Sequence, residues 1–247
     1  MSVRVFCLPE QRPKPGDRLI LSEEESHYVV RVRRRRSSDR VEVLDGVSSK
    51  WNSKLVVADP RQAVVQIEQK ISLGPSIPKV HLQIGMPDTS ATIEIITQAS
   101  ELGAESIIFS HCTRSQGRHP NNERIHRTLR AAMRQSGRTT PMSIIGPVDF
   151  DKAIRYAEQK SAFFASVHHQ QLTEPSHPIQ DESCVFVGPE GGFTDVEVQT
   201  LISANYTPFG LGPWTLRTQT AAIASLCRIL CTATIPPPSD KGQRAPC

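Results

Sequence analysis

The segment from Val185 to Glu197, which reads VFVGPEGGFTDVE, constrains the fold more than any other part of this sequence. Its first three residues are apolar and predict a buried strand. The glycine-rich residues Gly188–Gly192 predict a tight loop, and Thr194-x-x-Glu197 has the form of a capping box that starts a helix. A glycine-rich loop between a strand and a helix lets backbone N–H and C=O groups approach a ligand closely.

The spacing of the glycines narrows the ligand class. The loop lacks the G-x-G-x-x-G pattern of a dinucleotide site and the Lys-Ser/Thr pair of a P-loop, so a phosphate cradle is disfavoured. We interpret it as an adenosine pocket lined by main-chain atoms. A second loop, Leu211–Arg217, precedes an Ala-rich helix predicted to begin near Thr218. Two such loops close together in the sequence favour one shared site over two unrelated turns.

The chain before this region divides into two patterns. Residues 1–72 contain short β-branched runs and predict a small β-barrel. Within them, Ser22-x-x-Glu25 is the signature of a helix start, with the helix expected over Ser26–Arg33. A linker is predicted at 72–78. The runs expected to form strands are Val3–Phe6, Arg18–Leu21, Val41–Leu44, Leu55–Val57 and Ala63–Ile67.

Residues 78–233 alternate between strand and helix patterns, which predicts a parallel sheet covered on both faces. Residues 234–247 are rich in proline and polar residues and are expected to form a disordered tail. Helices are expected over Ile93–Leu102 and Glu123–Ser136. The expected strands are Val80–Ile84, Ser106–Phe109, Ala162–Val167 and Val185–Val187.

Composition excludes some functional classes. No apolar run approaches the length of a membrane span, and the N-terminal residues show no secretory signal, so a cytoplasmic protein is expected. The six cysteines form no C-x-x-C pair and have no nearby His pair at zinc spacing. We therefore expect reduced thiols and no metal.

Arginine is concentrated in two places, although the net charge is only +4. One cluster consists of Arg31, Arg33, Arg34, Arg35, Arg36 and Arg40. The second is a helical stripe of Arg124, Arg127, Arg130, Arg134 and Arg138. Like charges at this spacing repel, and an anionic partner relieves the repulsion. Arginine binds phosphate bidentately and stacks on unpaired bases, so RNA is the favoured partner over a plain solvated surface.

The paired loops resemble the RsmE family of small-subunit rRNA methyltransferases, within the SPOUT superfamily. The resemblance rests on Gly188-Pro189-Glu190-Gly191-Gly192-Phe193 and on Leu211-Gly212-x-x-x-Leu216-Arg217-Thr218-x-Thr220-Ala221. It covers nearly the whole chain. Arg4, the run from Arg31 to Arg34, Asp45-Gly46, Glu101-Leu102-Gly103, Arg114, Gln135-Ser136-Gly137-Arg138 and Pro141 follow in family order.

This resemblance implies a PUA-like barrel, then a SPOUT sheet whose last segment forms a trefoil knot, in a homodimer. It implies transfer of a methyl group from S-adenosyl-L-methionine to N3 of a uridine in 16S rRNA of the small ribosomal subunit. The expected cofactor-binding residues are Val187, Gly188, Pro189, Glu190, Gly191, Gly192, Leu211, Gly212, Leu216, Thr218, Thr220 and Ala221. The expected RNA-binding residues are Arg4, Arg31, Arg33, Arg34, Arg114, Arg127, Arg130 and Arg134.

The reaction requires loss of the uracil N3 proton and stabilisation of the resulting anion. Arg138 and Arg217 are our candidates for that stabilisation, although either also suits a phosphate contact. Glu190 is a candidate base, but a carboxylate in a glycine loop more often caps backbone N–H groups. The sequence leaves the base open.

The chain departs from the family pattern at Tyr28, Gln98, Thr113, Arg134 and Gln219. The family favours His in place of Tyr28, Lys in place of Gln98, and Glu at the other three positions. These departures keep two alternatives open. One is a non-catalytic RNA-binding assembly factor, and the other is a SPOUT methyltransferase with another RNA target. The intact glycine loop favours an active enzyme.

Overall fold

The computed structural model describes residues 2–73, 78–166 and 182–234. Most of the predicted linker and of the predicted tail lies outside these residues. The chain forms two compact units. The first comprises Met1–Ser76, Ile96–Gly103 and Asn121–Met142, and the second comprises Ile77–Ile95, Ala104–Pro120 and Ser143–Cys247. Within the described ranges, no helix is both long enough and apolar enough to cross a bilayer.

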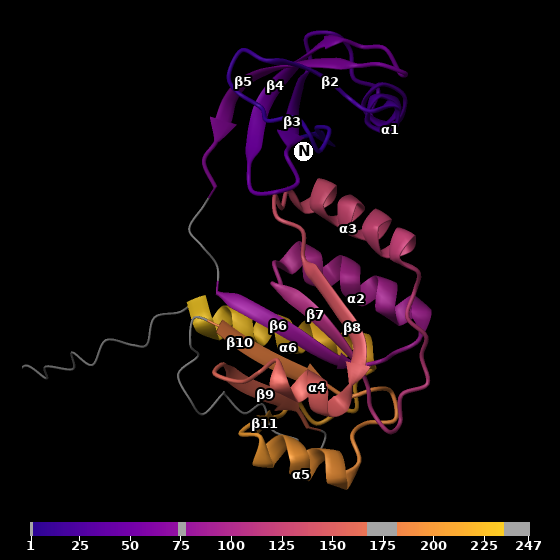
Figure 1. The fold of residues 1–247 in the computed structure, drawn as a ribbon, viewed down its shortest axis with the longest axis vertical. Helices are drawn as coiled ribbons and strands as arrows, with labels where there is room; N and C mark the ends of the chain where they lie inside the picture. The colour runs from indigo at the N-terminus through magenta and orange to yellow at the C-terminus, as the bar shows by residue number, and fades with distance from the viewer. Residues whose placement is uncertain (1, 74–77, 167–181, 235–247) are drawn as a thin grey trace, which may run out of the picture. The chain divides into compact units, whose positions relative to one another are not determined.

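The N-terminal strands of the first unit form a five-stranded sheet in the order β1-β3-β4-β5-β2. Strand β1 pairs with β3 in parallel, and the other neighbours pair antiparallel. The alternating apolar side chains face one core that includes Val5, Val43, Leu55 and Val65, each fully buried. The strands are β1 (Arg4–Phe6), β2 (Arg18–Ile20), β3 (Arg40–Leu44), β4 (Lys50–Val57) and β5 (Val64–Ile71) (Figure 1).

Strand β4 begins at Lys50, before the predicted start at Leu55, and the prediction missed its first half because one of the two buried residues there, Ser53, is polar. Ser53 is fully buried, and its hydroxyl donates a hydrogen bond to the Val41 carbonyl at 2.8 Å. The alternation of buried Trp51, Ser53 and Leu55 is that of a strand. Counting only apolar residues hides this period.

The predicted helix start at Ser22 is confirmed, since its hydroxyl accepts a hydrogen bond from the Glu25 amide. Helix α1 (Glu23–His27) continues as a π-helical turn, η1 (Tyr28–Val32). The Glu25 side chain does not complete a capping box. It lies buried, 1% exposed, and binds two arginines of helix α3 (Asn122–Ser136).

These arginines, Arg130 and Arg134, place their Nη2 atoms 2.9 and 2.5 Å from Glu25 Oε1. Arg130 also stacks on the Phe6 ring, with the guanidinium carbon 4.3 Å from the ring centroid. Arg134 stacks on Tyr28 at 4.2 Å. Part of the arginine stripe is therefore a packed ion-pair cluster within the first unit.

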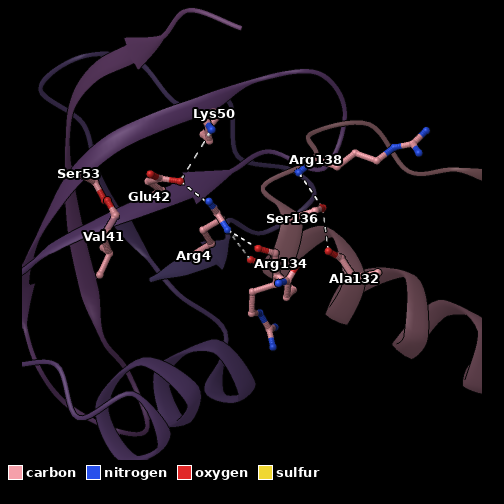
Figure 2. A network of polar contacts seen from close by, with 10 residues as sticks. Arg4, Val41, Glu42, Lys50, Ser53, Ala132, Arg134, Ser136 and Arg138 are labelled. Atoms are coloured by element: carbon pink, nitrogen blue, oxygen red, sulfur yellow. Dashed lines mark hydrogen bonds and ion pairs between the residues drawn. The ribbon is translucent and has the colours of Figure 1, made fainter. Parts of the chain in front are cut away.

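Arg4 makes a second set of contacts between the strands and α3 (Figure 2). Its Nε donates to Glu42 Oε2 at 2.9 Å, and its Nη1 donates to the carbonyls of Arg134 and Gln135 at the end of α3. Those carbonyls are among the unpaired groups at a helix terminus, so Arg4 satisfies them. Gly137 ends the helix with a left-handed φ of 81°. Arg138 follows this cap, so its assignment to the helical stripe was wrong.

The second unit contains a six-stranded sheet in the order β11-β9-β10-β6-β7-β8, parallel throughout. Helix α6 (Thr218–Thr234) packs on β6 and β10 behind the sheet, while α4 (Phe150–Arg155) lies in front of it (Figure 1). The predicted parallel α/β fold is confirmed. The strands are β6 (Lys79–Gly85), β7 (Ser106–His111), β8 (Ser143–Asp149), β9 (Ser161–Ala165), β10 (Glu182–Val187) and β11 (Thr207–Phe209).

Two further helices follow these strands, namely α2 (Thr89–Leu102) after β6 and α5 (Asp195–Ser203) after β10. Three elements were not predicted: β8, α4 and β11. Strand β8 is an edge strand with a half-exposed pattern and a proline, and β11 has three residues that include Pro208. Short, proline-containing edge strands carry little periodic signal.

We predict that Glu25→Ala destabilises the fold by about 3 kcal/mol, because it removes the buried, close counter-charge of the mostly buried Arg134 guanidinium and leaves only the exposed Glu24 carboxylate. The urea midpoint of unfolding measures the effect. Glu24→Ala is the matched control: this side chain is 75% exposed, 4.0 Å from the same arginine, and worth about 0–1 kcal/mol. Equal losses in the two variants would contradict the prediction.

Candidate functional site

A cavity of about 420 Å³ opens beside the carboxyl ends of β9 and β10. The strand order explains its place. After β6 the chain crosses to β7 on one side, and after β10 it crosses to β11 on the other, so the neighbouring strands β6 and β10 flank the topological switch point of the sheet. Ligands of open α/β sheets bind in the crevice at such a point.

The glycine loop after β10 forms one wall of this cavity. Its turn is closed by a 2.8 Å hydrogen bond from the Gly192 amide to the Pro189 carbonyl. Gly192 has a φ of +70°, which favours glycine. Pro189 packs directly on β6, where a Cβ at Gly85 would lie 2.7 Å from the proline nitrogen. The loop backbone is thus pressed against the neighbouring strand.

Glu197 in α5 ties this loop to the loop after β7. Its Oε2 accepts hydrogen bonds from the Thr194 amide and hydroxyl, which confirms the predicted capping box. Its Oε1 accepts a 2.7 Å hydrogen bond from the Thr113 amide. Burial alone would raise the pKa of Glu197, but the hydrogen bonds from Thr194 and Thr113 outweigh it and lower the pKa below its usual value.

Arg114 enters the site from the same β7 loop. Its Nη1 donates to the Gly191 carbonyl at 2.9 Å and reaches the Phe193 carbonyl at 3.4 Å. A turn positions it, with the Ser115 amide donating to the Cys112 carbonyl and the Cys112 amide donating to the Ser115 hydroxyl. The sequence predicted Arg114 as an RNA contact, and the structure places it in the wall of the cavity.

The predicted cofactor-binding residues come together here. All of them line the cavity except Thr220, which lies in the first turn of α6. Residues that the sequence did not indicate also line it, including Phe164, Ala165 and Ser166 at the end of β9. The signal for these three was present, since the end of a strand next to a glycine loop is part of the same crevice.

The cavity fits S-adenosylmethionine in size and chemistry. Its volume lies within the range of about 300–1,000 Å³ typical of small-molecule sites. Apolar side chains such as Val187, Leu211 and Leu216 suit the adenine ring, while loop amides and carbonyls suit its polar edge. Gly212 has a φ of +117°, and a Cβ added there would meet no atom within 4 Å, so the space above the second loop is open to a ligand.

Neither of the two predicted catalytic arginines is among the residues that line the cavity within the second unit. Arg217 is exposed and does not line the cavity, although its neighbours Leu216 and Thr218 do. Its carbonyl accepts the Ala221 amide at the start of α6. Arg138 belongs to the first unit and donates to the carbonyls of Thr140 and Ser100. Their catalytic roles stay predictions.

The predicted RNA-binding arginines differ in how far they are engaged. Arg31, Arg33 and Arg34 are exposed on and just after η1. Arg127 is 73% exposed and lies 3.7 Å from Glu123 on the same helix. Arg4, Arg130 and Arg134 make the ion pairs and stacking contacts described above. The exposed group is therefore the better candidate for RNA contact.

Comparisons with known proteins identify the family of the chain. Residues 75–230 match the RNA methyltransferase domain family, and residues 21–68 match the RNA methyltransferase PUA domain family. The fold and the site thus define an α/β RNA methyltransferase with an N-terminal PUA domain. Since the first match covers more than half of the chain, the protein belongs to the RNA methyltransferase domain family.

Individual relatives make the assignment more specific. The chain is 27% identical to ribosomal RNA small subunit methyltransferase E of Bacillus subtilis, over 90% of this chain and 93% of the relative. It is 28% identical to the protein of the same name from Aquifex aeolicus, over 90% and 96%. These relatives confirm the resemblance to the RsmE family.

Solved structures share the fold. A ribosomal RNA small subunit methyltransferase E from Neisseria gonorrhoeae, bound to S-adenosyl methionine, superposes with a TM-score of 0.78 at 23% identity, covering 92% of this chain and 96% of that one. A protein from Legionella pneumophila, in complex with bound S-adenosylmethionine, superposes with a TM-score of 0.78 at 23% identity, covering 94% of this chain and 98% of that one.

We predict that Gly191→Val weakens S-adenosylmethionine binding at least about tenfold, the equivalent of roughly 1.4 kcal/mol. A Cβ at position 191 would lie 3.0 Å from the Arg114 Cβ, so the larger side chain must displace the arginine and its loop contacts. Isothermal titration calorimetry measures the affinity. Thr200→Val is the control, because Thr200 is partly exposed and does not line the cavity, and an unchanged affinity in the Gly191 variant would refute the assigned site.

Glu197 gives a pH-dependent prediction. Because its pKa is lowered in the folded state, its contribution to stability is complete above the unfolded pKa of about 4.3 and is lost as the pH falls through the lower folded pKa. Glu197→Gln should cost about 1–3 kcal/mol at neutral pH and flatten the stability profile below pH of about 4. Denaturant unfolding between pH 3 and pH 7, on the scale of these carboxyl pKa values, measures both. If the stability of Glu197→Gln falls with decreasing pH as steeply as that of the wild type, Glu197 is not the source of this pH dependence.

Proposed function

We propose that this protein transfers a methyl group from S-adenosyl-L-methionine to N3 of a uridine in small-subunit ribosomal RNA. The observation that carries the proposal is the cavity at the switch point of the sheet, walled by both predicted loops. The relatives named ribosomal RNA small subunit methyltransferase E support the choice of RNA.

The bound cofactor supplies a methyl group already activated on a sulfonium, so the protein contributes orientation and electrostatics. The glycine-loop residues Gly188, Gly191 and Gly192 would hold the cofactor through main-chain atoms. Leu211 and Leu216 would pack on its adenine ring. Pairing in a duplex covers uracil N3, so the target must be unpaired or flipped out.

The finer features of the proposal follow from the resemblance. We propose a domain division at 1–72 and 78–233, with the PUA-like domain holding rRNA through Arg31, Arg33 and Arg34, which are exposed. We also propose a trefoil knot in the C-terminal segment, a homodimeric enzyme and a cytoplasmic location. Size-exclusion chromatography with light scattering tests the dimer.

Two departures from the pattern that the resemblance implies are compatible with this activity on physical grounds. Thr113 donates its amide to the Glu197 carboxylate, so a glutamate at position 113 would add a second negative charge close to it. Gln219 lies half-buried in the first turn of α6 and does not line the cavity. Its loss of charge relative to glutamate therefore does not remove a cavity wall.

Methyl transfer to small ribosomal subunits from cells lacking this gene tests the function. We predict that S-adenosylmethionine labelled on the methyl group yields labelled N3-methyluridine after nuclease digestion and mass spectrometry. Another labelled nucleoside would indicate a different RNA target. Absence of both transfer and cofactor binding would favour a non-catalytic RNA-binding factor.

A further inference from the structure

A second cavity, of about 480 Å³, adjoins the first and shares three of its residues: Arg114, Glu190 and Gly191. Asp88, Gln116 and Gly117 complete its lining. The first cavity has mainly apolar walls, whereas this one is lined by charged and amide side chains. A methyltransferase needs its acceptor atom next to the methyl donor, so an adjoining polar cavity has the position and the chemistry of an acceptor subsite.

The walls of the second cavity come from three loops at the carboxyl ends of neighbouring strands β10, β6 and β7, and they are locked together. Gly117 lies so close to the Pro87 carbonyl that a Cβ would collide with it. The Thr89 hydroxyl donates to the Arg118 carbonyl at 3.2 Å, and Arg114 holds the glycine loop through the Gly191 carbonyl. The cavity is therefore preformed in the protein.

The two carboxylates that line the second cavity, Asp88 and Glu190, differ in their hydrogen bonding. Asp88 Oδ1 accepts hydrogen bonds from the Ser90 amide and hydroxyl and from the Ala91 amide, which caps α2. The Ala91 amide is the largest cause of the lowered pKa of Asp88. Glu190 is exposed, and among the described residues no group hydrogen-bonds to its carboxylate. The expected capping role for Glu190 is therefore not seen in that part of the chain, which leaves its carboxylate available to a ligand.

The polar groups match the pairing edge of uracil. That edge presents an acceptor, a donor and an acceptor at O4, N3–H and O2. Gln116 and Arg114 carry donors, and Glu190 carries the acceptor for N3–H. Arg114 Nη1 is engaged by the loop carbonyls, so its Nε and Nη2 protons remain for the base. Cytosine carries a lone pair at N3, which the Glu190 carboxylate would repel.

We propose that the second cavity binds the flipped-out target uracil, with Glu190 as the general base and Arg114 as the stabiliser of the uracil anion. This inference rests on the proposed function. The N3 proton passes to the Glu190 carboxylate, and the N3 lone pair forms the new bond to the methyl carbon. The electron pair of the broken carbon–sulfur bond stays on sulfur, and the proton on Glu190 returns to solvent. The Arg114 charge beside the base lowers the pKa of its N3–H.

Binding of uridine monophosphate tests the subsite without requiring turnover. The protein is saturated with S-adenosylhomocysteine and titrated with uridine or cytidine monophosphate in a calorimeter. Gln116→Trp fills the cavity and should abolish uridine monophosphate binding, while the affinity for S-adenosylhomocysteine stays within about threefold, or roughly 0.65 kcal/mol. Arg118→Trp is the matched control, because its exposed side chain does not line the cavity. Equal uridine monophosphate affinity in the two variants would overturn the subsite.

Methyl transfer to small ribosomal subunits tests the base. Glu190→Gln should lower kcat by about 10²–10⁴-fold. The residual rate should rise about tenfold per pH unit, because only uracil that has already lost its proton reacts. If Glu190 had only a structural role, Glu190→Gln would lower the rate without this dependence on pH. An unchanged kcat would exclude Glu190 as the base. Full transfer by Gln116→Trp would refute the subsite alone, whereas a wild-type protein that binds uridine monophosphate but transfers no methyl would refute the proposed function alone.

Discussion

The Glu197 carboxylate is the interaction on which the site depends. It uses one oxygen to cap helix α5 at Thr194 and the other to hold the Thr113 amide in the loop after β7. One buried group thereby sets the distance between the glycine loop and the loop that carries Arg114. Because both cavities are bounded by these two loops, a single carboxylate positions the proposed cofactor site and the proposed base site together.

Arginine has two uses in this chain, and charge pattern alone does not separate them. The stripe on α3 looks like a polyanion contact, yet Arg130 and Arg134 meet a buried Glu25 and stack on aromatic rings. The resemblance to the RsmE family implies other residues at positions 28 and 134, and the structure brings Tyr28 and Arg134 into contact. A stacked pair at 4.2 Å shows that the two departures form one interaction, rather than two separate losses.

The sequence predicts those parts of the fold whose signals are local. The strand, glycine loop and capping box at Val185–Glu197 are confirmed because each depends on neighbouring residues. Strands β8 and β11 were missed because they are edge strands whose place is set by β7 and β9. Arg130, which binds Glu25, lies 105 positions away in the sequence, and no local pattern predicts a contact at that separation.

The same reasoning explains why the sequence named Glu190 as a candidate base but did not predict the proposed acceptor subsite around it. Asp88, Gln116 and Glu190 belong to three loops, and none of the three forms a motif with another in the sequence. They meet because β10, β6 and β7 are neighbours in a parallel sheet, so their carboxyl ends share one edge. Arg217, which belongs to the second loop of the family motif, is next to the cavity residues Leu216 and Thr218 in the sequence but does not line the cavity. The residues that complete a site of this kind are decided by strand order.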